Sequence, residues 1–300
     1  MLEALFQQFG FQMKVAQIMR GPLRGQLCAT RSAGGLLLQL TTNQCLSCSG
    51  NRNQRWLAIA LKQTDNLEMH RLRGEPVQPC SVQGFNRNLT ESIWQVSPHS
   101  HLSLLVVPVQ RILDLIALDP STTLQGVIDT SNVVTFQPRH FQTLKTFLLS
   151  HEIHEAPARD TLDARLVECF MQPDNISDAD IPLSSRAELT NDLLNYGFSN
   201  PSTAISLKDL SKTLLKSSSS ITKASREQFG VSPMQLLKQI RLQQVQRLLM
   251  DPEQQHELGT HSISAIAQRF GFTAPNHFAR DYRRMFWESP RQTLKLTGAA

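Results

Sequence analysis

The chain has 300 residues, of which 40% are hydrophobic and 18% are charged, and its formal net charge is +5 at pH 7. This hydrophobic share excludes an intrinsically disordered chain, because enough apolar surface is present to build a core. The length exceeds what one core usually fills, so we expect two domains.

The first residues, MLEALFQQFGFQMK, lack a basic segment followed by a long apolar run and a small-residue cleavage site. The longest apolar runs, such as residues 102–109, are too short to cross a bilayer. We therefore expect a cytoplasmic protein that has no membrane partner.

Residues 1–120 are predicted to form a β-rich domain. The segments GGLLLQLTTNQCLS, QRWLAIALKQ and HLSLLVVPV are typical of strands, and Gly, Pro and Asn lie between them. Residues 121–183 differ, because PRHFQTLKTFLLSHEIHEA and TLDARLVECFMQ have the character of helices. We predict a helical linker or dimerisation segment there, and the polar stretch at 173–185 marks its end.

The remaining part, residues 184–300, holds all of the excess positive charge. It contains 15 Lys and Arg against 9 Asp and Glu, whereas residues 1–183 contain 15 against 16. This asymmetry favours a nucleic-acid-binding half joined to a neutral half.

Two helix pairs are predicted in this basic half. In the later pair, an apolar stripe at Ile263, Ile266, Ala267 and Phe270 ends at Gly271, and a second helix begins near Pro275. Its apolar side carries the aromatic residues, and the opposite side carries Asn276, Ala279, Arg280 and Arg283.

The earlier pair follows the same plan. A leucine stripe at Leu207, Leu210 and Leu214 is followed by the serine-rich turn KSSSS and a helix. The outer side of that helix carries Ser219, Thr222, Lys223 and Arg226. A long helix that begins after Ser232, with Pro233 in its first turn, is predicted to connect the pairs.

This plan predicts a tandem helix-turn-helix, in which two helices enter successive major-groove segments about one turn apart. The alternative from periodicity alone is a helical bundle whose polar faces meet water. The segments FGVSPMQLLKQIRLQQVQRLL and ISAIAQRFGFTAPNHFARDYRRMFWESPRQ closely resemble the AraC/XylS family of transcription regulators.

The resemblance covers about the last 115 residues and implies an α+β chain with a seven-helix DNA-binding domain at 184–300. It implies binding to double-stranded promoter DNA and, as a rule, activation of transcription, with RNA polymerase as a further partner. The DNA-facing residues would be Ser219, Thr222, Lys223 and Arg226 in the first unit and Pro275, Asn276, Ala279 and Arg280 in the second, with Arg283 on the same face.

Two residues depart from the family pattern. Ser225 stands where an aromatic residue is usual, which predicts looser packing of the first recognition helix unless Phe229 compensates. Trp287 stands where a glycine is usual and puts the conformation of that turn in doubt. The N-terminal half loosely resembles the sensor halves of ethanolamine-operon regulators, which implies an unknown small effector or a homodimer.

A metal- or thiol-sensing or enzymatic β-domain, with a partner-binding helical domain, is the alternative function. Cys45 and Cys48 form a CxxC pair, but structural zinc needs two further ligands at suitable spacing. No P-loop, dinucleotide fingerprint, GxSxG or HExxH motif occurs, so we expect no enzyme, no catalytic or metal-ligating residue and no cofactor. Trp56 and Trp94 belong either to the core or to the lining of an effector pocket.

Overall fold

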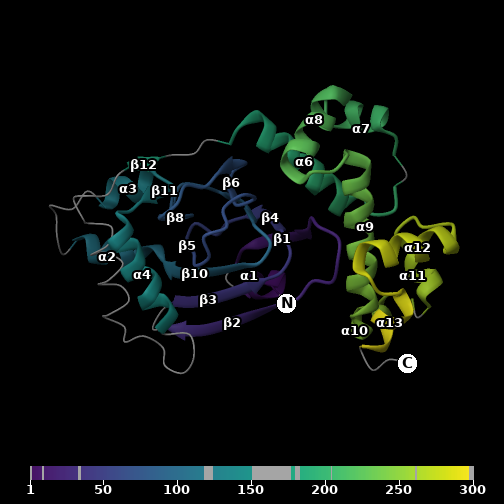
Figure 1. Ribbon diagram of the computed structural model, residues 1–300, viewed down its shortest axis with the longest axis horizontal. Coiled ribbons are helices and arrows are strands. Elements are labelled where there is room, and N and C mark those ends of the chain that lie inside the picture. Colours follow the sequence, from purple (N-terminus) through teal and green to yellow (C-terminus); the bar gives the residue numbers. More distant parts are fainter. Residues whose placement is uncertain are drawn as a thin grey trace. The chain divides into compact units, whose positions relative to one another are not determined.

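The structure is a computed structural model and describes residues 2–8, 10–32, 35–117, 124–150, 177–179, 183–203, 205–260 and 262–296. The chain forms two compact units (Figure 1). The first unit holds Met1–Val15 and Arg24–Leu183, and the second holds Ala16–Leu23 and Ser184–Ala300. The first is rich in strands and the second is helical, which confirms the predicted α+β class.

The first unit is built on two sheets. One has five strands in the order β1-β4-β9-β6-β7, and the other has seven in the order β12-β11-β8-β5-β10-β3-β2. Their bounds are β1 Gln12–Gln17, β2 Gly25–Ser32, β3 Gly35–Thr42, β4 Leu46–Asn51, β5 Trp56–Lys62, β6 Arg71–Leu72, β7 Glu75–Pro76, β8 Ser81–Gln83, β9 Glu91–Val96, β10 Ser100–Pro108, β11 Val133–Thr135 and β12 Ser177–Ala179.

Strand β10 shows why residues 104–107 are all apolar. It lies between β3 and β5 and pairs antiparallel with both. Its side chains alternate between two cores, because Leu105 and Val107 join one apolar cluster whereas Leu104 and Val106 join another. A strand that is buried on both faces has a nearly continuous hydrophobic sequence and not an alternation of apolar and polar residues.

Helices cover one of these cores. The first unit contains α1 Leu2–Gln8, α2 Val109–Ala117, α3 Leu124–Thr130 and α4 Pro138–Ser150. Ile116 of α2, Ile128 of α3 and Phe141 of α4 pack in the same cluster as Leu105. Residues 124–150 therefore share the core of the sheet, although the sequence predicts a linker from residue 121 onward. The helix expected over 161–172 lies outside the described residues.

The described part of the second unit contains eight helices, one more than the seven expected, and the addition is the six-residue α10. The bounds are α6 Ser185–Ser199, α7 Leu207–Thr213, α8 Ser218–Phe229, α9 Pro233–Leu249, α10 Pro252–Glu257, α11 Ile263–Arg269, α12 Pro275–Phe286 and α13 Pro290–Lys295. Six of them begin after a serine whose hydroxyl accepts a backbone N–H of the first turn. No helix in the described ranges is both long and apolar enough to cross a membrane.

Helix α9 is the connector that the sequence predicts. Leu236, Leu237 and Ile240 are almost fully buried, and α9 contacts both α6 and α8. Further along the same helix, Val245 and Leu249 pack in a cluster with residues of α11 and α12. The two helix pairs therefore share one scaffold helix.

A segment from the other end of the sequence, Ala16–Leu23, completes the helical unit; we call it the strap. The backbone N–H of Gln17 donates to Oε1 of Gln243 on α9 (2.7 Å), and Nε2 of Gln243 donates to the carbonyl oxygen of Gln17 (2.8 Å). The N–H of Gly21 donates to the carbonyl oxygen of Met285 on α12 (2.7 Å). The strap thus hydrogen-bonds to the connector and to the last helix of the second pair.

We predict that Gln243→Leu lowers the free energy of unfolding of the helical unit by about 2–4 kcal/mol, because it leaves two buried backbone groups of Gln17 without partners. Urea denaturation of the full chain measures this effect. The matched control is Gln244→Leu, since Gln244 lies beside Gln243 and makes one long hydrogen bond (3.4 Å) to Gly197. Equal losses in the two variants would contradict a specific role of the strap.

Candidate DNA-binding surface and cavity

The first helix pair consists of α7 and α8. Helix α8 begins after Ser217 and ends at Gly230, which adopts the left-handed conformation at φ 71°. Its inner face is buried through Ile221, Ala224 and Phe229. On its outer face, Ser219, Lys223 and Arg226 are exposed and Thr222 is partly exposed.

The sequence predicts looser packing at Ser225 of α8 unless Phe229 compensates, and the structure shows the surroundings of both residues. The side chain of Ser225 is fully buried, and its hydroxyl donates to the carbonyl oxygen of Val231 (2.8 Å). A buried hydroxyl is costly only when it lacks a partner. Phe229 is buried on the same helix, so the inner face keeps an aromatic contact.

The second helix pair consists of α11 and α12, and its turn depends on Gly271. This residue adopts φ 79°, and a β-carbon at this position would lie 2.7 Å from the carbonyl oxygen of Ser202. Both the conformation and the close approach therefore require glycine. The need for glycine at position 271 explains why the apolar stripes of α11 and α12 are interrupted in the sequence.

A row of aromatic rings fixes α12. The ring centroids of Phe272 and Phe278 are 5.2 Å apart, those of Phe278 and Tyr282 are 5.6 Å apart, and those of Tyr282 and Phe286 are 4.7 Å apart. The Tyr282 hydroxyl is paired with Oγ1 of Thr293 on α13 at 2.8 Å. The aromatic face of α12 is thus fully used in packing, and the helix turns its opposite face to solvent.

That opposite face carries the remaining predicted residues. Pro275, Asn276, Arg280 and Arg283 are exposed, and Ala279 is partly exposed. Among the described residues, Arg280 and Arg283 form no ion pair, and neither do Lys223 and Arg226 on α8. These cations are therefore available to an external anion. The neighbouring Asp281, in contrast, is paired with Lys238 of α9 at 3.2 Å.

Trp287 ends α12 in a left-handed conformation, with φ 61° and ψ 18°. A residue with a β-carbon is strained there, and glycine is not. The indole is 72% exposed, so little packing offsets the strain. The sequence put the conformation of this turn in doubt, and the structure shows that the turn keeps the geometry of a glycine although a tryptophan occupies it.

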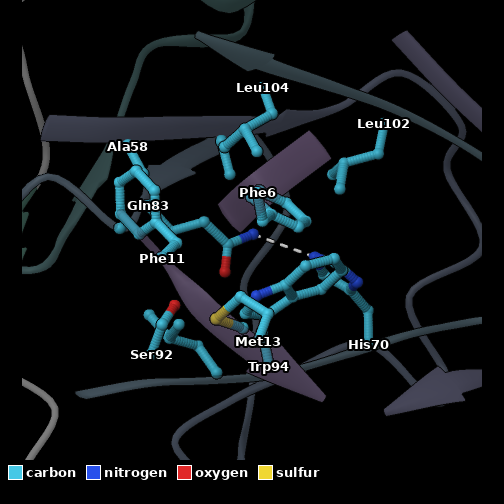
Figure 2. Close-up of a pocket in the computed structure, with 13 residues that line it drawn as sticks. Phe6, Phe11, Met13, Ala58, His70, Gln83, Ser92, Trp94, Leu102 and Leu104 are labelled. Carbon is cyan, nitrogen blue, oxygen red and sulfur yellow. Dashed lines mark hydrogen bonds between the residues drawn. The ribbon is translucent and has the colours of Figure 1, made fainter. Parts of the chain in front are cut away.

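A second candidate site is a cavity in the first unit (Figure 2). Its enclosed volume is about 40 Å³, and the figure rises to about 550 Å³ when all space out to its open mouth is counted. Its lining residues come from α1, from both sheets and from the loops between them, and they are Phe6, Phe11, Met13, Ala58, Ala60, His70, Leu72, Gln83, Gly84, Ser92, Trp94, Leu102 and Leu104. Both tryptophans in question pack against one apolar cluster, and of the two only Trp94 is among the residues that line the cavity.

The residues that line the cavity are mostly apolar, and the polar side chains among them are those of His70, Gln83 and Ser92. Nε2 of Gln83 and Nε2 of His70 are 2.9 Å apart, and both side chains are buried. Burial, and then the charge of Lys62, lowers the pKa of His70 to about 3, so the imidazole is neutral at ordinary pH. Sequence reasoning missed this pair, because neither residue belongs to a motif.

Cys45 and Cys48 are both fully buried. Burial raises the pKa of the Cys45 thiol to about 12, so it stays protonated, and a protonated thiol is a poor nucleophile and a poor metal ligand. Within the described ranges, no group of three His, Cys, Asp or Glu side chains is placed to hold a metal ion. The buried thiols favour a packing role over the sensing role that the sequence left open.

Comparison with known proteins indicates which type of domain the helical unit contains. Residues 210–296 match the model of a helix-turn-helix domain family. The chain is 31% identical over 97 residues to the XylDLEGF operon transcriptional activator 2 of Pseudomonas putida, a stretch that covers 32% of this chain and 59% of that protein. The chain carries an AraC/XylS-type helix-turn-helix domain.

Two solved structures also match the chain, both with TM-scores below 0.5. A probable AraC family transcriptional regulator from Rhodopseudomonas palustris CGA009 is 33% identical, with 37% of this chain and 97% of that chain covered at a TM-score of 0.32. ToxT from Vibrio cholerae is 13% identical, with 95% and 98% covered at a TM-score of 0.33.

Within the AraC-type domain, Leu210 and Arg241 are both used for packing. Leu210 is fully buried, and the Arg241 guanidinium lies 5.9 Å from the centre of the Phe272 ring. This arginine joins the connector to the turn of the second pair through a cation–π contact. The residues expected to face DNA lie on the outer faces of α8 and α12, and their contacts with DNA remain a prediction.

We predict that Trp287→Gly raises the free energy of unfolding of the AraC-type domain by about 1 kcal/mol, because it removes left-handed strain. Trp287→Ala is the matched control, since it removes the same indole but keeps the β-carbon. Denaturant titration of the full chain compares the two. Greater stability of the alanine variant would contradict the strain at this turn.

Proposed function

We propose that the chain is a sequence-specific transcription regulator that binds promoter DNA through its AraC-type domain and activates transcription. The observation that carries this proposal is the pair of outer faces on α8 and α12, where polar and cationic side chains are exposed while the inner faces pack. Major-groove base edges pair with such side chains, and phosphates attract such cations. An activator of this kind acts on RNA polymerase at the promoter.

The same proposal assigns an effector-binding role to the first unit. Small-molecule sites are concave and mostly apolar, with few polar groups, and the cavity beside Trp94 and His70 has these properties. The first unit would then sense the molecule, and the AraC-type domain would read the DNA.

We predict that Arg280 reads a base, whereas Arg284, one turn further along α12, contacts the phosphate backbone or solvent. Arg284 borders a groove that is lined by residues of α9 and the strap, and Arg280 does not. Arg280→Ala should weaken binding to the preferred site by about 1–3 kcal/mol and relax the preference at one base pair. Selection from a randomised DNA pool, followed by titration of the selected and scrambled sites, measures both effects.

The matched control is Arg284→Ala, which removes the same charge from the same helix. It should weaken binding to every sequence equally, if at all, and leave the preference intact. If Arg280→Ala also weakens binding to all sequences equally, Arg280 is a phosphate contact. If the wild-type chain selects no sequence, the proposed function is wrong.

A further inference from the structure

Two polar side chains of the cavity, Gln83 and His70, indicate which kind of molecule fits it, on the premise that the cavity is the effector site proposed above; Ser92 is the other hydroxyl- or amide-bearing residue of the lining. Figure 2 shows Gln83 reaching across the cavity toward His70, with one end of its carboxamide hydrogen-bonded to the imidazole. The other end, the carboxamide oxygen, points into the space bordered by Met13 and Trp94.

The orientation of this carboxamide is coupled to the tautomer of His70. The imidazole is neutral, and Nε2 of Gln83 lies 2.9 Å from Nε2 of His70, so Gln83 is the donor when the imidazole proton is on Nδ1. Among the described residues, none donates a hydrogen bond to Oε1 of Gln83. The side chain is 97% buried, so an acceptor without a partner faces the cavity.

No charged side chain is among the residues that line the cavity. The charge of Lys62 acts on His70, but Lys62 does not line the cavity, and its ammonium group donates to Oδ1 of Asn66 (2.8 Å). An anionic or cationic ligand would lose its hydration and find no counter-charge in this lining, which makes its binding unfavourable.

We infer that the cavity binds an uncharged, mostly apolar molecule that carries one hydrogen-bond donor and places this donor on Oε1 of Gln83. The apolar walls, led by Phe6, Phe11 and Leu104, take the body of the molecule. Gln83 is the specificity-determining residue, and His70 is a positioning residue that fixes the orientation of its carboxamide.

The test uses three bicyclic probes and isothermal titration of the full chain. Indole is neutral and has an N–H donor, benzofuran has the same shape without a donor, and indole-3-carboxylate is charged. Indole should bind about three- to tenfold more tightly than benzofuran, which corresponds to one hydrogen bond, and the carboxylate should bind more weakly than both. This comparison needs no variant, so it holds even if a substitution in the cavity prevents folding.

Two variants test whether Gln83 causes the difference in affinity between indole and benzofuran. Gln83→Leu should abolish the difference between indole and benzofuran, whereas Gln63→Leu should preserve it, because Gln63 is a buried glutamine that bonds Ser103 and does not line the cavity. Equal binding of indole and benzofuran by the wild type, tightest binding of the carboxylate, or binding of none of the probes would overturn the inference.

Titration of selected DNA with the same preparation separates the two proposals. A chain that binds DNA but does not discriminate between the probes contradicts the ligand class alone. A chain that discriminates between the probes but selects no DNA contradicts the proposed function and leaves the ligand class standing.

Discussion

The burial of helix α9 is the constraint on which the helical unit depends. Its 17 residues span about 26 Å, and helices α6, α8, α10, α11, α12 and α13 all contact it. A helix with so many neighbours can be stable only if each neighbour turns its apolar face inward. The polar faces of α8 and α12 are therefore left outside, on helices whose position one scaffold fixes. The candidate DNA-binding surface is a consequence of this packing.

The same burial explains the strap. Helix α9 carries glutamines at buried positions, and a buried amide must find partners or destabilise the fold. Gln243 finds both of its partners in the backbone of Gln17, which lies 226 residues away in the sequence. The helical unit thus includes a segment from near the N-terminus, and the first two residues of this segment, Ala16 and Gln17, are the last two of β1.

Local features could be predicted from the sequence because they depend on neighbouring residues. Ser217 and Ser232 start helices, and Gly271 makes a turn that only glycine accommodates, so the two helix pairs and the connector are confirmed. The buried strand β10 was also recognisable, since a short apolar run bounded by turn residues is typical of a buried strand. The exposed faces of α8 and α12 follow from helical periodicity, although their roles toward DNA remain predictions.

Features that depend on distant residues could not be predicted. Phe6, Gln83 and Leu104 meet at the cavity only after both sheets have formed, and no spacing in the sequence relates them. The packing of residues 124–150 on the sheet, in a range predicted to be a linker, has the same cause, because an amphipathic helix does not indicate which surface it covers. The hydroxyl of Ser225 likewise found its partner in the backbone of Val231, which the sequence does not reveal.

Chemical probing of guanine N7 on a selected DNA site, with and without the full chain, tests the central claim most directly, because this atom lies in the major groove. Two helix pairs on one rigid connector should protect two major-groove segments on the same face, about 10 base pairs apart. Arg280→Ala should remove protection from one segment and leave the other. A single protected segment in the wild type, or protection confined to the minor groove, would contradict the tandem reading of DNA by α8 and α12.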